Sequence, residues 1–420
     1  MKLIKFIGNW FKKNKPALEF VLKVFLIWQL VVFLISASGS QAFPSTGRYL
    51  YTEKRAEVGE VSPDWFWNRA NFDGIHYLSI ARLGYGLHQQ AFFPFYPKLI
   101  NWLSLLFGRR ELLTALFISA ASLFGALFFL NKLFRLDYSK KTSRKALIYL
   151  LIFPTAFFFA NAYTESLFLF LVVASFYFAR TRKWLLAGIL GGLAANTRLP
   201  GIFLFPALWV EFAYQRKLSD RHTFKKWLSL MKERIMARRA FLKRHLSLVV
   251  GLCSLLFIPL GLFSYMSFLK VNYQDPLLFV HVQKYFGAER SSGKIILLYQ
   301  VFWRYLKMII TCEKLSLLYF TVWLEVLTAI LFLALLIFGW YRKIRPSYLV
   351  FGLFSFLTPT LTGTFSSLPR YVLVIFPCFL ALALLEKEKK FKKPLRIYFF
   401  LSLVLFFVCQ VLFFRGFWVS

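Results

Sequence analysis

The chain has 420 residues, of which 59% are hydrophobic and only 17% are charged. Ordinary soluble domains carry about 25% charged residues, so the composition argues against a soluble globular protein. The formal net charge of +35 would suit a nucleic-acid-binding protein. However, the lysines and arginines gather in short segments between apolar runs, as in the cytoplasmic loops of membrane proteins. We therefore expect a lipid bilayer as a partner, and no nucleic acid.

The first segment, Met1–Ala37, begins with basic residues and continues into a long apolar core that is rich in phenylalanine. We interpret it as a retained signal-anchor helix rather than a cleaved signal peptide. Five lysines among the first 15 residues predict a cytoplasmic N-terminus, because positive charge stays on the inner side. The four cysteines have neither metal nor redox spacing, so they predict no disulfide and no metal site.

A charge-balanced segment, Ser38–Gln90, follows this first span and is typical of an outside loop. The next strongly basic cluster, Lys132–Lys145, is expected inside. An odd number of crossings must separate the two, and Leu112–Phe134 supplies one. The shorter apolar run Phe92–Phe107 contains two prolines near its start, so we interpret it as a helix at the outer interface. The first outer loop then extends over residues 38–110.

The remaining apolar runs alternate across the membrane with the basic segments always inside. They are continuous rather than alternating in polarity, which favours helices over a β-barrel. The prediction is an all-α polytopic membrane protein of about eleven spans, forming one domain over residues 1–420. It has a basic cytoplasmic loop at 214–245, expected to be an amphipathic helix, and a second outer loop at 272–313. The expected spans are Leu18–Ala37, Leu112–Phe134, Ala146–Ala162, Ser166–Ala179, Trp184–Thr197, Pro200–Phe212, Leu246–Phe268, Leu315–Trp340, Tyr348–Thr364, Tyr371–Leu385 and Ile397–Phe414.

This topology places a set of charged, polar and aromatic residues on the outer side. Ionisable groups at membrane depth are costly, so a functional cavity is the default hypothesis. Taken singly, Asp73 could cap the helix Ile75–Leu83, Glu165 could suit a helix dipole, and arginines could reach lipid headgroups. Their joint placement favours a site. The candidate residues are Asp73, His76, Tyr77, Tyr85, Tyr163, Glu165, Arg198, Asp275, Gln283, Arg370 and Tyr371.

The chemistry of this set suits transfer of a sugar from a phosphate-linked donor. A carboxylate, here Asp73, accepts the proton of the attacking hydroxyl. Guanidinium groups, here Arg198 and Arg370, bind phosphate oxygens in a bidentate way. The aromatic residues would hold the sugar and the lipid. No glycine-rich phosphate loop of the nucleotide-binding type occurs, and no metal-ligand spacing stands out, so no cofactor is expected.

Five segments resemble, in the same order, signatures of the GPI mannosyltransferase 2 family (phosphatidylinositol-glycan class V). They are "FDGIHYLSIARLGY" with "AFFPFYP", "FPTAFFFANAYTESLFLFL", "LAANTRLPGI", "YQDPLLFVHVQ" and "LPRYVLVIFP", between Phe72 and Pro377. The chain departs from the family at Phe72, where tryptophan is usual, at His76, which is often tryptophan or another aromatic residue, and at Leu199-Pro200, where Ser-Asn is common. The lysine- and phenylalanine-rich composition suggests a prokaryotic member.

The resemblance implies a GT-C class glycosyltransferase, with interfacial helices in its first outer loop. Its implied reaction is inverting transfer of a hexose, mannose in eukaryotic members, from a polyprenyl-phosphate sugar to a lipid-linked or cell-surface glycan at the non-cytoplasmic face. It also implies a catalytic role for Asp73 and for Glu165. The expected location is the prokaryotic cytoplasmic membrane, or the endoplasmic reticulum membrane in a eukaryote.

Two alternatives remain at this point. A transporter or flippase of lipid-linked saccharides would use similar basic and aromatic surfaces. The one-sided polar set favours the enzyme, because a transporter needs polar groups near the bilayer midplane. A non-catalytic assembly subunit would tolerate the loss of both Asp73 and Arg370.

Overall fold

The computed structural model describes residues 2–42, 55, 58–59, 62–216, 249–287 and 295–419, and these residues form helices joined by short turns. Among these described residues, five helices are long and apolar enough to cross a membrane. Their ranges agree with five of the expected spans. They are α1 (Lys2–Ala42), α6 (Glu111–Phe134), the stretch Val249–Tyr273 that contains α13 (Phe257–Tyr273), α16 (Leu317–Tyr341) and α20 (Lys392–Phe414).

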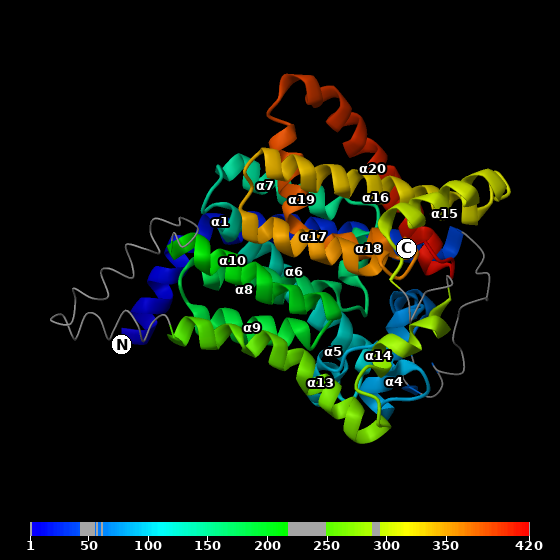
Figure 1. Cartoon of the computed structure of the whole chain (residues 1–420), viewed down its shortest axis with the longest axis horizontal. Helices are drawn as coiled ribbons and strands as arrows, with labels where there is room; N and C mark the ends of the chain where they lie inside the picture. The colour runs from blue at the N-terminus through cyan, green and yellow to red at the C-terminus, as the bar shows by residue number, and fades with distance from the viewer. Residues whose placement is uncertain are drawn as a thin grey trace.

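Shorter helices fill the space between the long ones (Figure 1). The central one, α8 (Glu165–Arg180), is buried along most of its length and packs between α6 and α9 (Trp184–Ala195). Helix α9 in turn approaches α13 so closely that a Cβ on Gly261 would lie 2.0 Å from the carbonyl oxygen of Gly192. On the other side lie α10 (Leu204–Arg216), α17 (Pro346–Thr360) and α19 (Phe376–Leu385).

Two expected spans are interrupted in the structure. The helix predicted over Ala146–Ala162 ends early, since α7 covers Lys140–Leu151 and a short 3-10 helix, η4, covers Ala156–Ala160. Pro154 disfavours α-helix at the residue before it, which explains the break. The span predicted over Tyr371–Leu385 is also broken. Its two parts, Leu368–Val374 and α19, meet at an angle of 82°. The total of eleven spans stays a prediction.

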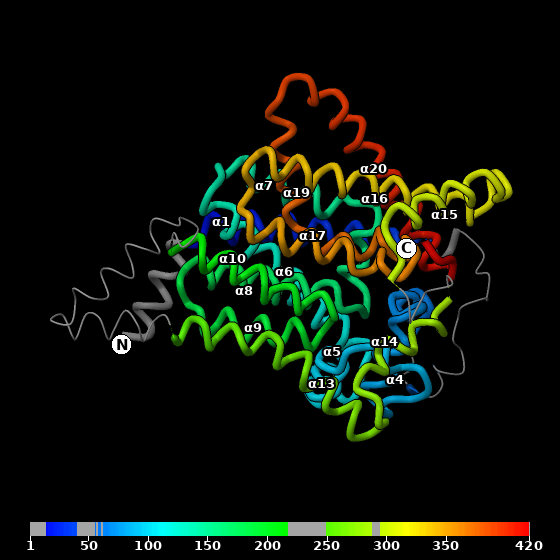
Figure 2. The backbone as a smooth tube through the Cα atoms, viewed as in Figure 1, coloured from blue at the N-terminus to red at the C-terminus, as the bar shows by residue number. Residues whose placement is uncertain are grey.

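The segment predicted to be the first outer loop contains short helices rather than a full span. They begin with α3 (Asp64–Trp67) and η1 (Asn68–Ala70) and continue through α4 (Asp73–Leu83), η2 (Gln89–Ala91), α5 (Phe95–Ser104) and η3 (Leu105–Phe107). None of these reaches the length of a span, in agreement with the prediction for Phe92–Phe107. Helices α4 and α5 lie together at one end of the bundle, which we call the site end (Figure 2).

The second predicted loop, 272–313, is also partly helical. It contains α14 (Leu278–His281), η6 (Val282–Phe286) and the amphipathic α15 (Leu298–Thr311). Both α14 and α15 lie at the site end (Figure 1). The predicted cytoplasmic helix over 214–245 lies outside the described residues, except for its first three, which end α10.

Candidate functional site

The site is built around the first turn of α4, where the backbone is strained. Phe72 occupies the N-cap position with φ 58° and ψ −117°, and a positive φ is unusual for a bulky side chain. Asp73 is therefore the first helical residue and not the cap, so the capping role considered for it is wrong. Behind it, a Cβ on Gly74 would lie 3.2 Å from the Tyr163 ring and 3.4 Å from the carbonyl oxygen of Ala162. A side chain at position 74 would require these neighbours to shift by a few tenths of an ångström, so glycine suits the close start of α4 against the 161–164 turn.

Four charged side chains from four distant segments meet there, and we call them the ionic quartet: Asp73, Glu165, Arg198 and Arg370. Arg370 in α18 (Leu368–Tyr371) donates from Nη1 to Asp73 Oδ2 over 2.6 Å. Its Nε lies 3.6 Å from Glu165 Oε1. The same carboxylate oxygen accepts a 2.8 Å hydrogen bond from Arg198 Nη1. The four residues predicted for catalysis and phosphate binding thus form one chain of alternating charge.

Burial differs between the two carboxylates of the quartet. The Glu165 side chain is 1% exposed, whereas that of Asp73 is 21% exposed, and Arg370 between them is 5% exposed. Two acids and two guanidiniums balance formally, as buried charges require. Asp73 is therefore the carboxylate that a molecule from outside can reach, and Glu165 is enclosed by arginines.

Several polar atoms around the quartet lack a hydrogen-bond partner within the described part of the chain. They are Glu165 Oε2, Arg370 Nε and both polar atoms of the Asn161 side chain, all of them buried. Buried polar atoms are nearly always satisfied by protein, water or ligand. Their grouping beside the ion pairs indicates a place where water or ligand oxygens bind.

Aromatic rings surround the two guanidiniums. The Tyr371 ring centroid lies 5.2 Å from Arg198 Cζ and 5.1 Å from Arg370 Cζ, within cation–π range. The Tyr163 ring is 5.4 Å from Arg370 Cζ, and its hydroxyl donates to the backbone carbonyl of Asn71 over 2.6 Å. Burial raises the pKa of Tyr163 and of Tyr77 well above the usual value. Both phenols therefore stay protonated at neutral pH and do not act as bases.

The other predicted binding residues make contacts that hold the surface helices together. His76 stacks on Phe92 with ring centroids 5.0 Å apart, and the Tyr85 hydroxyl donates to the Phe92 carbonyl over 2.7 Å. Gln283 donates to the carbonyl of Phe279. These contacts do not join the three residues to the quartet.

Asp275 belongs to the same surface layer. Its Oδ2 lies 2.6 Å from His281 Nδ1, and this hydrogen bond holds the pKa of the Asp275 carboxyl below its usual value. The structure shows a surface pair here, and the predicted substrate contact of Asp275 stays a prediction.

The sequence interpretation missed the contribution of the C-terminal segment. Trp418 lies 5.7 Å from Arg370 Cζ, measured to its ring centroid, and 5.0 Å from the Phe72 ring. Just before it, the carbonyl of Phe413 accepts a 3.0 Å hydrogen bond from Asn71 Nδ2. A tryptophan directly after the last apolar span was the available signal, because Trp favours membrane–water interfaces.

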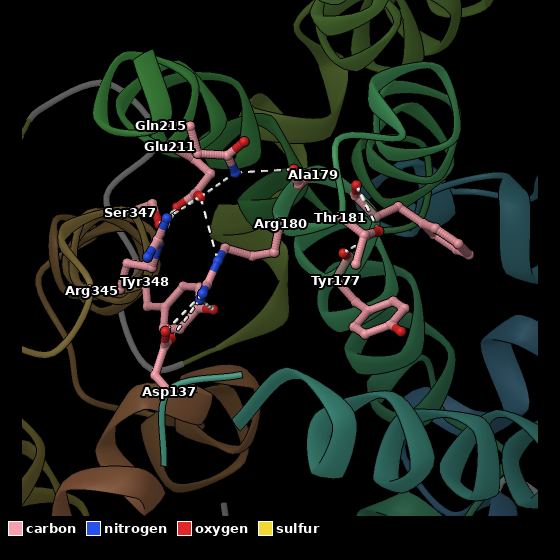
Figure 3. Close-up of polar contacts among 11 residues, drawn as sticks. Asp137, Tyr177, Ala179, Arg180, Thr181, Glu211, Gln215, Arg345, Ser347 and Tyr348 are labelled. Carbon is pink, nitrogen blue, oxygen red and sulfur yellow. Dashed lines mark hydrogen bonds and ion pairs between the residues drawn. The ribbon is translucent and has the colours of Figure 1, made fainter. Parts of the chain in front are cut away.

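A second ionic cluster lies at the opposite end of α8 (Figure 3). Glu211, fully buried, accepts hydrogen bonds of 2.7 Å from both Nε and Nη2 of Arg345, and Ser347 also donates to it. Arg180 binds both carboxylate oxygens of Asp137, at 2.6 and 2.8 Å. The 16 residues of α8 separate the clusters by roughly 24 Å. Because the hydrogen bonds within this cluster satisfy both of its carboxylates, we interpret it as a clamp between helix ends.

No group of three or more histidine, cysteine, aspartate or glutamate side chains that could hold a metal ion occurs among the described residues.

Comparisons with known proteins give one family and a structural likeness. The sequence profile of the family described as mannosyltransferase (PIG-V) matches residues 17–299. The structure is similar to crystal structures of ArnT from Cupriavidus metallidurans. For ArnT bound to undecaprenyl phosphate, the identity is 14%, the TM-score is 0.45, and the match covers 94% of this chain and 76% of that chain. For the apo state the values are 14%, 0.44, 94% and 75%. No curated protein matches the chain significantly.

Proposed function

The chain belongs to the mannosyltransferase (PIG-V) family, and on this premise we propose that it transfers a hexose, mannose in the first instance, from a polyprenyl-phosphate sugar. The acceptor is a hydroxyl of a lipid-linked or cell-surface glycan, and the reaction takes place at the non-cytoplasmic face of the membrane. The observation that carries the proposal is the ionic quartet, in which one reachable carboxylate directly adjoins a guanidinium.

Asp73 is the proposed general base. Its carboxylate is the more exposed acid of the quartet, and the guanidinium of Arg370 lies 2.6 Å away as its balancing positive charge. The acceptor oxygen attacks C1 of the sugar from the side opposite the phosphate, and its proton passes to Asp73. A new glycosidic C1–O bond forms while the bond from C1 to the phosphate oxygen breaks, with inversion at C1.

Arg370 and Arg198 are the proposed binding groups for the donor phosphate. The electron pair of the broken bond leaves with polyprenyl phosphate, and the added negative charge is stabilised by guanidinium hydrogen bonds. The Nε of Arg370, which makes no hydrogen bond and lies 3.6 Å from Glu165 Oε1, is one donor for a phosphate oxygen. Because the phosphate would share Arg370 with Asp73, donor binding is expected to loosen the ion pair and to turn Asp73 toward the acceptor.

Glu165 has a supporting role in this proposal rather than the role of a second base. Its Oε1 faces both guanidiniums and its side chain is enclosed. A fixed carboxylate in this position orients the two arginines and offsets their mutual repulsion. The rings of Tyr163, Tyr371 and Trp418 complete the pocket wall, and aromatic faces suit both a sugar ring and an isoprenoid chain.

The test is transfer by the purified full-length chain in detergent with polyprenyl-phosphate mannose and a glycolipid acceptor. Mass spectrometry should detect an acceptor heavier by one hexose, and Asp73→Asn should abolish most of this product. Movement of the donor across a vesicle membrane without a new glycosidic bond would identify a flippase and refute the proposal.

A further inference from the structure

A buried acid in the middle of the bundle lies outside the quartet. Glu325 is the single charged residue of α16, and its side chain is buried. A carboxylate inside an apolar span is costly and is kept where it has a specific partner and task. Its Oε2 accepts a short hydrogen bond from the hydroxyl of Tyr305 in α15.

Tyr305 connects this acid to the turn that precedes α18. Its hydroxyl oxygen accepts from the backbone N–H of Phe365 at 3.1 Å and lies 3.0 Å from Thr364 Oγ1. Thr364 Oγ1 itself accepts from the N–H of Ser366 at 3.0 Å. Since Tyr305 donates to Glu325, the hydroxyl proton of Thr364 is directed to Tyr305. The phenol oxygen therefore holds α15, α16 and the 364–366 turn together.

Helix α15 and a residue just before it also form hydrogen bonds with the segment just before this turn. Arg304 Nη1 donates to the carbonyl of Gly363 at 3.2 Å. The backbone N–H of Ile296, just before α15, donates to the carbonyl of Leu361 at 3.0 Å. The Phe365 ring packs 4.8 Å from the Tyr305 ring. Residues 361–365, which lead into the turn and form its first part, are thereby held by α15 and the residues just before it.

The turn leads directly into the residue that carries the donor phosphate in the proposed reaction. Ser367, at φ 66°, is the N-cap of α18, and its carbonyl accepts from the N–H of Arg370 at 3.1 Å. From the other side, Thr155 Oγ1 donates to the carbonyl of Pro369 at 2.6 Å. The position of the Arg370 guanidinium therefore depends on where residues 364–367 are held.

We infer that Tyr305 and Glu325 are positioning residues, which set the 364–367 turn so that Arg370 meets the phosphate of the donor. The inference rests on the proposed function for the phosphate role of Arg370. Tyr305 and Glu325 do not touch the substrate. They act through the backbone of the turn, and their loss should weaken donor binding while acceptor binding stays the same.

The test compares equilibrium binding of undecaprenyl phosphate to the purified full-length chain and to four variants. Tyr305→Phe removes the phenol oxygen and should weaken binding about tenfold, since it leaves buried polar groups without a partner. Thr364→Val should act in the same direction, and Glu325→Gln, which keeps an acceptor oxygen, should cost less. The matched control is Tyr299→Phe on the same helix, whose ring is 68% exposed and which should bind as the unmodified chain does.

Two further measurements separate positioning from general loss of structure. In the transfer assay, Tyr305→Phe should raise KM for the donor about tenfold and leave KM for the acceptor unchanged. In an Arg370→Ala background, Tyr305→Phe should weaken lipid binding no further, because both changes act on one interaction.

Binding by Tyr305→Phe and Thr364→Val equal to that of the unmodified chain, with Arg370→Ala binding weakly, would overturn the inference alone. Equal rises of both KM values would also overturn it. If Arg370→Ala itself bound undecaprenyl phosphate normally, the phosphate site of the proposed function would fail, and the inference with it.

Discussion

Replacing Asp73 by asparagine separates the proposed role of the carboxylate as a base from its observed pairing with Arg370. The change keeps the size of the side chain and removes its negative charge. A positioned general base contributes roughly 10²- to 10⁴-fold to turnover, and this is the role that we propose for Asp73. We expect kcat of the asparagine variant to fall by about that factor, measured as hexose transfer by mass spectrometry.

The same substitution should strengthen binding of the lipid phosphate. In the free protein Arg370 gives one hydrogen bond to Asp73 at 2.6 Å, and a phosphate must compete for it. A hydrogen bond to a charged group contributes about 1.5–3 kcal/mol and a neutral one about 1 kcal/mol. The side chain of Arg370 is 5% exposed and that of Asp73 is 21% exposed, so solvent screening is moderate. The difference of about 1 kcal/mol predicts binding of undecaprenyl phosphate about fivefold tighter in the variant.

The proposed arrangement therefore predicts that Asp73→Asn lowers kcat and, at the same time, raises the affinity for undecaprenyl phosphate. Undiminished turnover in the Asp73→Asn variant would remove Asp73 from the mechanism. Weaker lipid binding would refute the competition between Asp73 and phosphate for Arg370, and it would place Asp73 among the groups that hold the donor. The control is Asp64→Asn in α3, an exposed carboxylate paired with Arg55, for which neither quantity should change.

Three further substitutions test the framework around the site. Glu165→Gln leaves two enclosed guanidiniums without their shared carboxylate, so we expect a loss of about 3 kcal/mol in the free energy of unfolding, seen as a thermal midpoint below that of the Asp73 variant. Glu211→Ala breaks the buried pair with Arg345 at the opposite end, and a loss of about 3–5 kcal/mol should appear in thermal unfolding while kcat of the folded fraction stays unchanged. Gly261→Ala places a Cβ 2.0 Å from the carbonyl oxygen of Gly192, so α9 and α13 must separate, and the thermal midpoint should fall by several degrees.

The sequence predicts the long elements well, because a run of about 20 apolar residues has few alternatives. Charge parity also correctly separated Leu112–Phe134, a helix of span length, from Phe92–Phe107, which is not. The misjudged elements all contain proline or lie in loops. Pro154 interrupts the predicted span Ala146–Ala162. Helix α15 is amphipathic, with Val301 and Tyr305 on its buried face, and the prediction of a loop over 272–313 does not include this helix.

The sequence does not predict which acid of the site pairs with which arginine. The alternation of basic segments and the family-like motifs predict that Asp73, Glu165, Arg198 and Arg370 lie on one side of the membrane. The structure brings all four together in the ionic quartet. Asp73 and Arg370 are 297 positions apart, and nothing local in the chain shows which acid faces which base. The same limit explains why Trp418 was missed, since its partners Phe72 and Arg370 are joined to it only through the packing of α20.

The two ionic clusters at the ends of α8 show why similar residues have different tasks. At the Glu211 end, the hydrogen bonds of Arg345, Gln215 and Ser347 satisfy both carboxylate oxygens, and the helix ends close over them. At the Glu165 end, Glu165 Oε2 and Arg370 Nε make no hydrogen bond. The adjoining Asp73 side chain is partly exposed. A clamp gains stability by satisfying every polar atom, whereas a site must keep hydrogen-bonding capacity for its ligand. The incomplete hydrogen bonding at the quartet is therefore the structural feature that favours it, rather than the Glu211 cluster, as the proposed place of the reaction.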